Sequence, residues 1–73
     1  MIQKPKTVKV RVTVSHRGGP EIARYLVQEH NASVAVYNAM INYHDHRKMD
    51  LDSEADKVIV RTDRFKYTAE VVE

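Results

Sequence analysis

The side chains best suited to chemistry near the N-terminus are two cations and a hydroxyl at alternate positions, Lys9, Arg11 and Thr13, within "TVKVRVTV". The four positions that flank and separate them are all valine. Because successive side chains of a strand point to opposite faces, this pattern predicts a strand over 7–14 with one apolar face and one cationic face. The cationic face is suited to an acidic partner or a polyanion. An amphipathic edge strand whose cations discourage aggregation is the alternative.

Other polar groups along the chain do not combine into a catalytic or metal site. His44 and His46 are two positions apart, so they would point apart on a helix, and no complementary cluster accompanies them. Four acids alternate over 50–56 but lack the central glycine and closing glutamate of a calcium loop. Ser15 and His16 are adjacent only in sequence. The sequence therefore predicts no enzyme activity, no cofactor and no metal.

Length and charge limit the fold and its partners. A chain of 73 residues without cysteine has room for one domain of marginal stability and no disulfide to support it, so oligomerisation is expected. No run approaches the roughly 18 apolar residues of a membrane span and no secretory signal is visible, which favours a cytoplasmic protein. Residues 1–19 carry five cations and no acid, whereas residues 50–73 carry seven acids and four cations. This charge gradient predicts that a polyanion or an acidic partner binds at the N-terminal strand.

Two helices are expected after the strand. Pro20 suits a first helical turn and predicts a short helix over 20–30. Asn31 and Ser33 are good N-cap residues and predict a second helix that runs to about residue 46. This second helix has two neighbouring apolar stripes, so it would be covered best by a second copy of itself. The residues of the two stripes are Val36, Ala39, Met40 and Tyr43, and Val34, Tyr37 and Ile41.

The C-terminal third is expected to differ from the rest of the chain. Residues 49–57 are polar and acidic and predict a linker. Two β-prone runs, 58–62 and 65–72, predict a hairpin because Asp63 and Arg64 separate them. The chain then divides into a core over 1–49 and a linker with a hairpin over 50–73, which is either part of the same domain or an appended partner-binding element. A monomeric β-α-α-β-β domain is the alternative fold.

The order strand, helix, turn, helix over about 7–46 resembles the ribbon-helix-helix family of DNA-binding repressors. The stretch "SVAVYNAMINY" carries the resemblance best, since Ser33, Val36, Ala39, Met40 and Tyr43 have the spacing of the family's second helix. The resemblance implies an α+β fold in which two chains pair their first strands and insert this antiparallel ribbon into the major groove of DNA. It implies a homodimer that binds double-stranded DNA, such as a small transcriptional repressor or a plasmid or phage regulator.

The same resemblance assigns roles to residues. Base contacts would come from Lys9, Arg11 and Thr13. Phosphate contacts would come from Lys4, Lys6 and Arg17 and from the start of the second helix, at Asn31, Ala32 and Ser33. The dimer core would contain Val8, Val10, Val12, Val36, Ala39, Met40 and Tyr43.

A protein-binding module is the alternative function. A compact α+β domain, such as a phage-encoded inhibitor, would use its basic strand or its hairpin to hold an acidic host protein. Such a module can be monomeric, whereas the ribbon requires a dimer because a lone strand would leave its valine face exposed. Oligomeric state and DNA binding therefore separate the two hypotheses.

Overall fold

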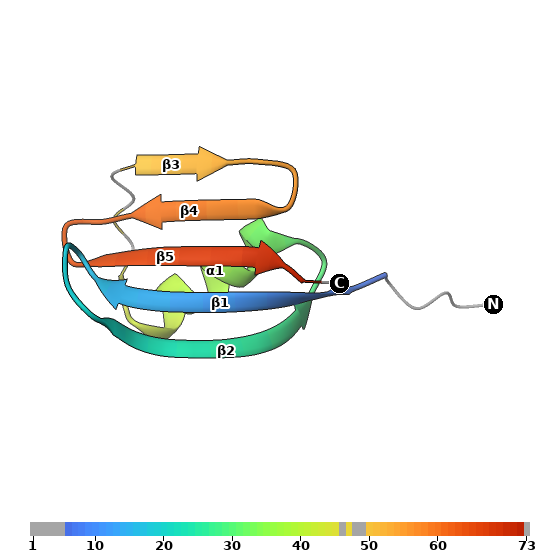
Figure 1. Ribbon diagram of the computed structural model, residues 1–73, viewed down its shortest axis with the longest axis horizontal. Coiled ribbons are helices and arrows are strands. Elements are labelled where there is room, and N and C mark those ends of the chain that lie inside the picture. Colours follow the sequence, from blue (N-terminus) through green and yellow to red (C-terminus); the bar gives the residue numbers. More distant parts are fainter. Residues whose placement is uncertain (1–5, 46, 48–49, 73) are drawn as a thin grey trace.

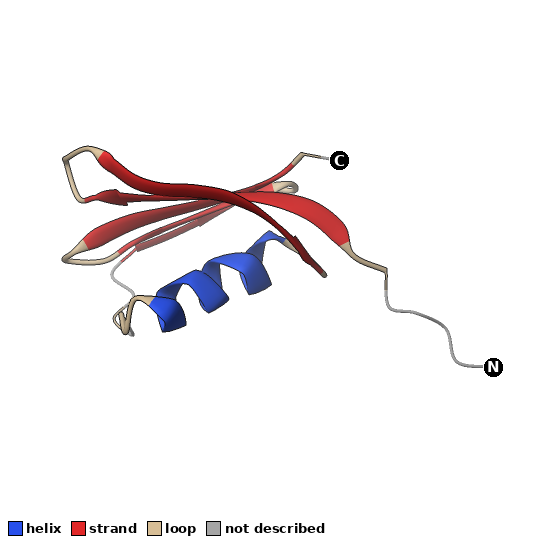
Figure 2. Ribbon diagram, turned by 90° about the horizontal axis from the view of Figure 1, so that it is seen from below, coloured by secondary structure: helices blue, strands red, loops and turns tan. Residues whose placement is uncertain are grey.

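The computed structural model describes residues 6–45, 47 and 50–72, and shows one antiparallel sheet with a helix across one of its faces (Figures 1 and 2). The spatial order of the strands is β2-β1-β5-β4-β3. In chain order the elements are β1 (Val8–His16), β2 (Glu21–Glu29), α1 (Ala32–Asn42), β3 (Asp50–Ser53), β4 (Lys57–Arg61) and β5 (Phe65–Val71).

The predicted first strand is confirmed, and it lies inside the sheet as β1, one strand from the β2 edge. It pairs with β2 on one side and with β5 on the other. Val10, Val12 and Val14 are fully buried on the face that α1 covers (Figure 2). The alternating valines of this segment therefore form one buried face of the strand, as expected. The interpretation of this segment as an edge strand is wrong, because both of its edges are paired.

The helix predicted over 20–30 is wrong, since this segment forms strand β2. Residues 16–20 form a tight turn, in which Gly18 has a φ of 69° and the His16 N–H donates to the Pro20 carbonyl at 3.0 Å. The strand that follows has its own alternation, with Ala23, Tyr25 and Val27 partly buried and the residues between them exposed. Pairing with β1 buries this apolar face, whereas a helix over the same residues would have had only an incomplete stripe.

The helix predicted from Asn31 is confirmed at its start and is shorter than expected at its end. The Asn31 side chain accepts a hydrogen bond from the Val34 N–H at 2.9 Å, and α1 ends at Asn42. Because residues 6–45, 47 and 50–72 form one helix and five strands, both expected folds, the ribbon-helix-helix dimer and the monomeric β-α-α-β-β domain, are wrong.

The residues assigned to a dimer core instead pack within one chain. Val10, Val12, Val36, Ala39 and Met40 belong to its buried core, and Val8 and Tyr43 pack against that core. The first apolar stripe of the helix therefore packs on the chain's own sheet, whereas Tyr37 and Ile41 of the second stripe are exposed.

The C-terminal segment belongs to the same sheet as β1. The hairpin is confirmed, because β4 pairs antiparallel with β5. The prediction of a linker over 49–57 is wrong in part, since Asp50–Ser53 forms the edge strand β3. Strand β5 lies between β1 and β4, so the hairpin completes the sheet that covers the core. His46, which was considered as a metal ligand, lies outside the described residues.

A buried carboxylate joins the end of α1 to the β4–β5 turn. Asp45 is 3% exposed, and its Oδ2 accepts hydrogen bonds from Thr62 Oγ1 at 2.7 Å and from the Tyr67 hydroxyl at 2.9 Å. Thr62 Oγ1 also accepts from the backbone N–H groups of Arg64 and Phe65, at 3.1 and 3.0 Å. The network therefore satisfies the buried polar groups of this turn, which would be costly to leave unpaired.

This network predicts a loss of stability at alkaline pH. Burial, together with the hydrogen bond to Asp45, raises the pKa of the Tyr67 hydroxyl above its ordinary value. Because the folded state holds this proton more tightly than the unfolded state, the contribution of Tyr67 is fully present below about pH 10 and declines as the pH rises further. We expect urea unfolding between pH 9 and 11.5 to show a smaller pH dependence in Tyr67→Phe than in the wild type.

Tyr37→Phe is the control for this experiment, because Tyr37 is 67% exposed. It should keep the pH dependence of the wild type. Equal slopes for the wild type and Tyr67→Phe would show that ionisation of Tyr67 does not limit alkaline stability.

Candidate functional site

The face of the sheet opposite α1 has no helix over it, and Figure 1 looks onto this open face. Strand register places the exposed, mostly polar residues of the strands there. Six cations belong to the open face in the described part of the chain: Lys9, Arg11, Arg24, Lys57, Arg61 and Lys66. Four acids accompany them, but Glu21, Asp50 and Asp52 lie on the outer strands, which leaves Glu70 as the acid of the three inner strands. The centre of the open face is therefore cationic.

The three residues predicted to contact bases lie together on this open face, on the interior strand β1. Arg11 lies between Leu26 of β2 and Glu70 of β5. Thr13 lies between Arg24 and Thr68 in the same way, and Lys9 is opposite Gln28. The polar residues of β1 thus form an inner row of a broad surface, and not one half of a two-stranded ribbon.

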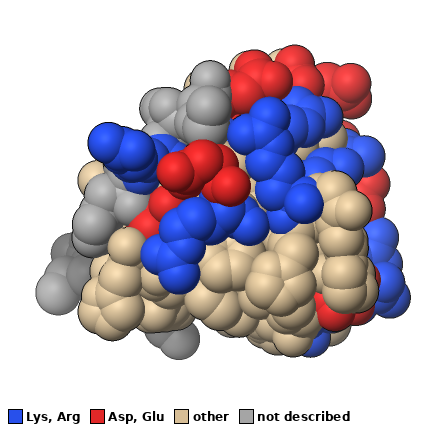
Figure 3. Space-filling view, turned by 90° about the vertical axis from the view of Figure 1, so that its left-hand side faces the viewer, with Lys and Arg blue, Asp and Glu red and all other residues tan. Residues whose placement is uncertain are grey.

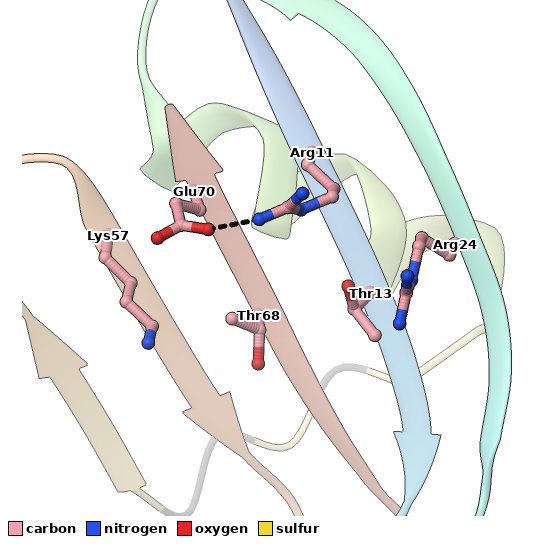
Figure 4. A pocket seen from close by; sticks show the side chains of 6 residues that line it. All are labelled: Arg11, Thr13, Arg24, Lys57, Thr68 and Glu70. Atoms are coloured by element: carbon pink, nitrogen blue, oxygen red, sulfur yellow. Dashed lines mark hydrogen bonds and ion pairs between the residues drawn. The ribbon is translucent and has the colours of Figure 1, made fainter. Parts of the chain in front are cut away.

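A hollow of about 340 Å³ occupies the centre of the open face (Figure 4). Its lining consists of Arg11, Thr13, Arg24, Lys57, Thr68 and Glu70. Thr13 and Thr68 are directly opposite each other on β1 and β5. Arg24, from β2, and Lys57, from β4, lie on the two sides of this hydroxyl pair (Figure 4). The hollow therefore combines two neutral hydroxyl groups with three cationic side chains and one carboxylate.

Two exposed ion pairs orient the arginines of the hollow. Nη2 of Arg11 lies 2.6 Å from Oε1 of Glu70, and Nη2 of Arg24 lies 2.8 Å from Oε1 of Glu21. The side chains of both arginines are well exposed, at 46% and 61%, so these pairs add little to stability and are readily exchanged for another anion. Hydroxyl and guanidinium donors around one hollow are suited to the oxygens of a phosphate or a carboxylate.

A second group of cations lies beside the hollow, toward the β4–β5 turn. Arg61 and Lys66 are directly opposite each other on β4 and β5. Like charges in this position destabilise a sheet. Arg61 is partly neutralised, since its Nη1 lies 3.3 Å from Asp50 and 3.1 Å from Asp52, both on β3. Viewed from the end that carries this turn, cations and acids alternate over the surface (Figure 3).

The residues predicted to contact phosphates are dispersed. Arg17 lies in the β1–β2 turn, where its Nη1 donates to the Thr62 carbonyl at 3.2 Å. Lys6 is exposed before β1, and Lys4 lies outside the described residues. Asn31, Ala32 and Ser33 are at the start of α1, on the other side of the sheet from the open face (Figure 2). The helix start and the cationic residues of β1 therefore cannot contact the same stretch of ligand.

Sequence reasoning missed the residues that β2, β4 and β5 contribute to the hollow. Thr68 lies in "FKYTAEV", which alternates apolar and polar residues as β1 does, so this run could have placed Thr68 on the polar face of a strand. Arg24 and Lys57 lie in "EIARYLVQE" and "KVIVR", where apolar residues occur on both faces and give no such signal. The pairing of the strands is what places all three residues around Thr13.

The structure lacks a platform on which bases could stack. Of the described aromatic residues, Phe65 and Tyr67 are buried in the core and Tyr25 and Tyr43 pack against it. Tyr37 is exposed, but it belongs to α1. The open face therefore presents cations, hydroxyls and a few aliphatic side chains, and its described residues include no aromatic ring.

A smaller apolar groove lies on the other side of the sheet, between α1 and the β3–β4 hairpin. Its volume is about 170 Å³, and its lining is Ser33, Val36, Tyr37, Met40, Leu51, Val58 and Val60. Tyr37 and Leu51 are 67% and 49% exposed. This groove is an apolar candidate for a protein contact.

The described residues contain no group of three or more His, Cys, Asp or Glu side chains that could hold a metal ion. They also contain no helix long and apolar enough to cross a membrane. No family model, no curated protein and no solved structure matches this chain.

Proposed function

We propose that this protein binds double-stranded nucleic acid through the open face of its sheet. The observation that carries the proposal is the central hollow, where Arg11, Arg24 and Lys57 surround the hydroxyl groups of Thr13 and Thr68. A phosphate group in this hollow would accept hydrogen bonds from the hydroxyls and the guanidinium groups. The cations that surround the hollow would contact neighbouring phosphates of the same backbone.

The shape of the face favours contacts to the backbone over the reading of bases. Five strands spaced about 4.8 Å apart span roughly 19 Å between the outermost strands, which is wider than the roughly 12 Å major groove. A two-stranded ribbon fits that groove, but β1 is flanked by strands on both sides. Since phosphate contacts position a protein without reading sequence, we propose that Lys9, Arg11 and Thr13 contact the backbone.

A duplex suits the open face better than a single strand. Proteins that bind single strands use aromatic side chains on which unpaired bases stack. The described residues of the open face have no aromatic side chain. A duplex instead presents its phosphates outside and its bases inside, which matches a surface of cations and hydroxyls.

The first test is a titration of a mixed-sequence 20-base-pair DNA duplex, followed by fluorescence anisotropy at several salt concentrations. We expect binding that weakens steeply with salt. Arg24→Ala should weaken binding and reduce the slope of log K against log salt by about one unit, because one phosphate contact contributes about 0.9.

Arg47→Ala is the matched control for this titration. Arg47 is a strongly exposed cation, 84% accessible, in the loop after α1 and outside the open face. It should leave the salt slope close to that of the wild type. Equal effects of Arg24→Ala and Arg47→Ala would indicate attraction by net charge alone, and a folded protein that ignores DNA at low salt would refute the proposal.

A protein-binding module is the second candidate, and the groove between α1 and the β3–β4 hairpin favours it. Its exposed Tyr37 and Leu51 offer an apolar contact that a nucleic acid would not use. Peptides selected on the wild-type protein should bind a Leu51→Lys variant poorly if they use this groove. Peptides that bind both proteins equally well would exclude it.

A further inference from the structure

The two edges of the sheet differ in how they are protected from pairing with another chain. Strand β3 is a short edge of four residues, and two of them are aspartates. Strand β2 is the opposite edge, a strand of nine residues that pairs only with β1. Natural proteins protect exposed edges with short strands, charged side chains (lysine above all), prolines or bulges. From Ala23 to Glu29, β2 has neither lysine nor proline, its charged residues are Arg24 and Glu29, and its register with β1 is regular.

The same strand exposes apolar side chains. Leu26 is 57% exposed and Ile22 is 41% exposed. A hollow of about 450 Å³ lies beside Leu26, lined by Arg11, Arg24, Leu26 and Val72 and by Tyr25, which packs against the core from the other face of β2. A second apolar side chain placed next to Leu26 would therefore find space and apolar neighbours on the open face.

The length of overlap and the charges together select one way for two copies of β2 to pair symmetrically. In an antiparallel pair related by a two-fold axis, one residue is opposite its own copy, and the other pairs follow from it. Axes at residues 24, 25 and 26 pair seven or more residues of β2 with the second copy, and axes elsewhere pair fewer. An axis at Arg24 places two arginines opposite each other, and an axis at Tyr25 places Glu21 opposite Glu29. An axis at Leu26 places leucine opposite leucine, Arg24 opposite Gln28 and Tyr25 opposite Val27, so no like charges meet.

We propose that two copies of this chain associate through β2, antiparallel, with Leu26 opposite Leu26 of the second copy. The product is a continuous sheet of ten strands. Because the two-fold axis is perpendicular to the sheet, both helices lie on one side and both open faces lie on the other. The interface uses backbone hydrogen bonds and an apolar contact, and it does not depend on the proposed binding of nucleic acid.

The association is tested on the protein alone, by sedimentation velocity from 5 to 200 µM without nucleic acid. We expect a dimer for the wild type and a monomer for Leu26→Lys, which brings two cations together at the axis. Leu51→Lys is the control, since Leu51 is similarly exposed, at 49%, but lies on the opposite edge. It should remain dimeric. A monomeric wild type at 200 µM, or a dimer that survives Leu26→Lys, would overturn the proposal.

Cross-linking tests the register. The chain has no cysteine, so each single-cysteine variant reports on one position only. Residues directly opposite each other have Cβ atoms about 4.5–5.5 Å apart, close to the separation that a disulfide needs. Leu26→Cys should therefore form a disulfide-linked dimer under mild oxidation. Arg24→Cys should form no such dimer. With the axis at Leu26, the two cysteines at position 24 would be four residues, or about 13 Å, apart along the strands. Cross-linking through position 24 in preference to 26 would refute this register.

Discussion

The Thr62→Val variant is expected to lose about 3 kcal/mol of unfolding free energy, although it keeps the volume and the β-branched shape of the side chain. Thr62 is fully buried. Its hydroxyl donates to Asp45 and accepts from the N–H groups of Arg64 and Phe65. Valine would leave these three groups with fewer partners, and a buried carboxylate with one donor fewer is especially costly.

Thr68→Val is the matched control, because Thr68 lies on the open face and is only partly buried. It makes the same chemical change where no buried network is lost, so its unfolding free energy should stay within about 0.5 kcal/mol of the wild type. Urea unfolding followed by circular dichroism at pH 7 compares the three proteins. A loss below about 1 kcal/mol in Thr62→Val would show that water or a rearranged turn replaces the hydroxyl.

Lys66→Glu is expected to change stability and binding in opposite directions. Lys66 is directly opposite Arg61, so a carboxylate there would replace a like-charge pair with an ion pair. This should raise the unfolding free energy by roughly 0.5 kcal/mol. The same change removes a cation from the open face and adds an anion, so we expect the affinity for duplex DNA at low salt to fall by about tenfold or more.

Arg47→Glu separates the local effect from that of net charge. It changes the charge of the protein by the same amount, but at a residue outside the open face. We expect its loss of affinity to be clearly smaller than that of Lys66→Glu when both are measured by anisotropy in the same buffer. If Lys66→Glu is stabilised and still binds DNA as the wild type does, the open face is not the binding surface.

Local patterns in the sequence predicted those elements whose signals are also local. The alternating valines of β1, the N-cap at Asn31 and the break at residues 63–64 all act within a few residues, and each appears in the structure. The segment that became β2 gave two signals. Pro20 suits a helix start, but the glycines before it also suit the turn of a hairpin. The β1–β2 hairpin forms instead of the helix because pairing satisfies the backbone groups along one edge of β1 and buries Ala23, Tyr25 and Val27.

The candidate site could be predicted only in part, for a related reason. Lys9, Arg11 and Thr13 were identified from the alternation within one strand. Their neighbours come from strands distant in the sequence, and Arg11 and Glu70, which form an ion pair, are 59 positions apart. No local pattern encodes the order in which strands pair, so the hollow became visible only once the sheet was assembled.

The position of β5 has a consequence for how the chain folds during synthesis. Among the five strands this one is synthesised last, yet it lies between β1, which is synthesised first, and β4. Until residue 71 has left the ribosome, the first hairpin and the helix cannot complete the core, and the valine face of β1 lacks part of its cover. Folding of the sheet should therefore be completed only after β5 has emerged, and it should be comparatively slow for so small a domain, because its closing step joins β1 and β5, the two strands farthest apart in the sequence. During that interval the nascent chain would be a substrate for chaperones that bind exposed apolar strands.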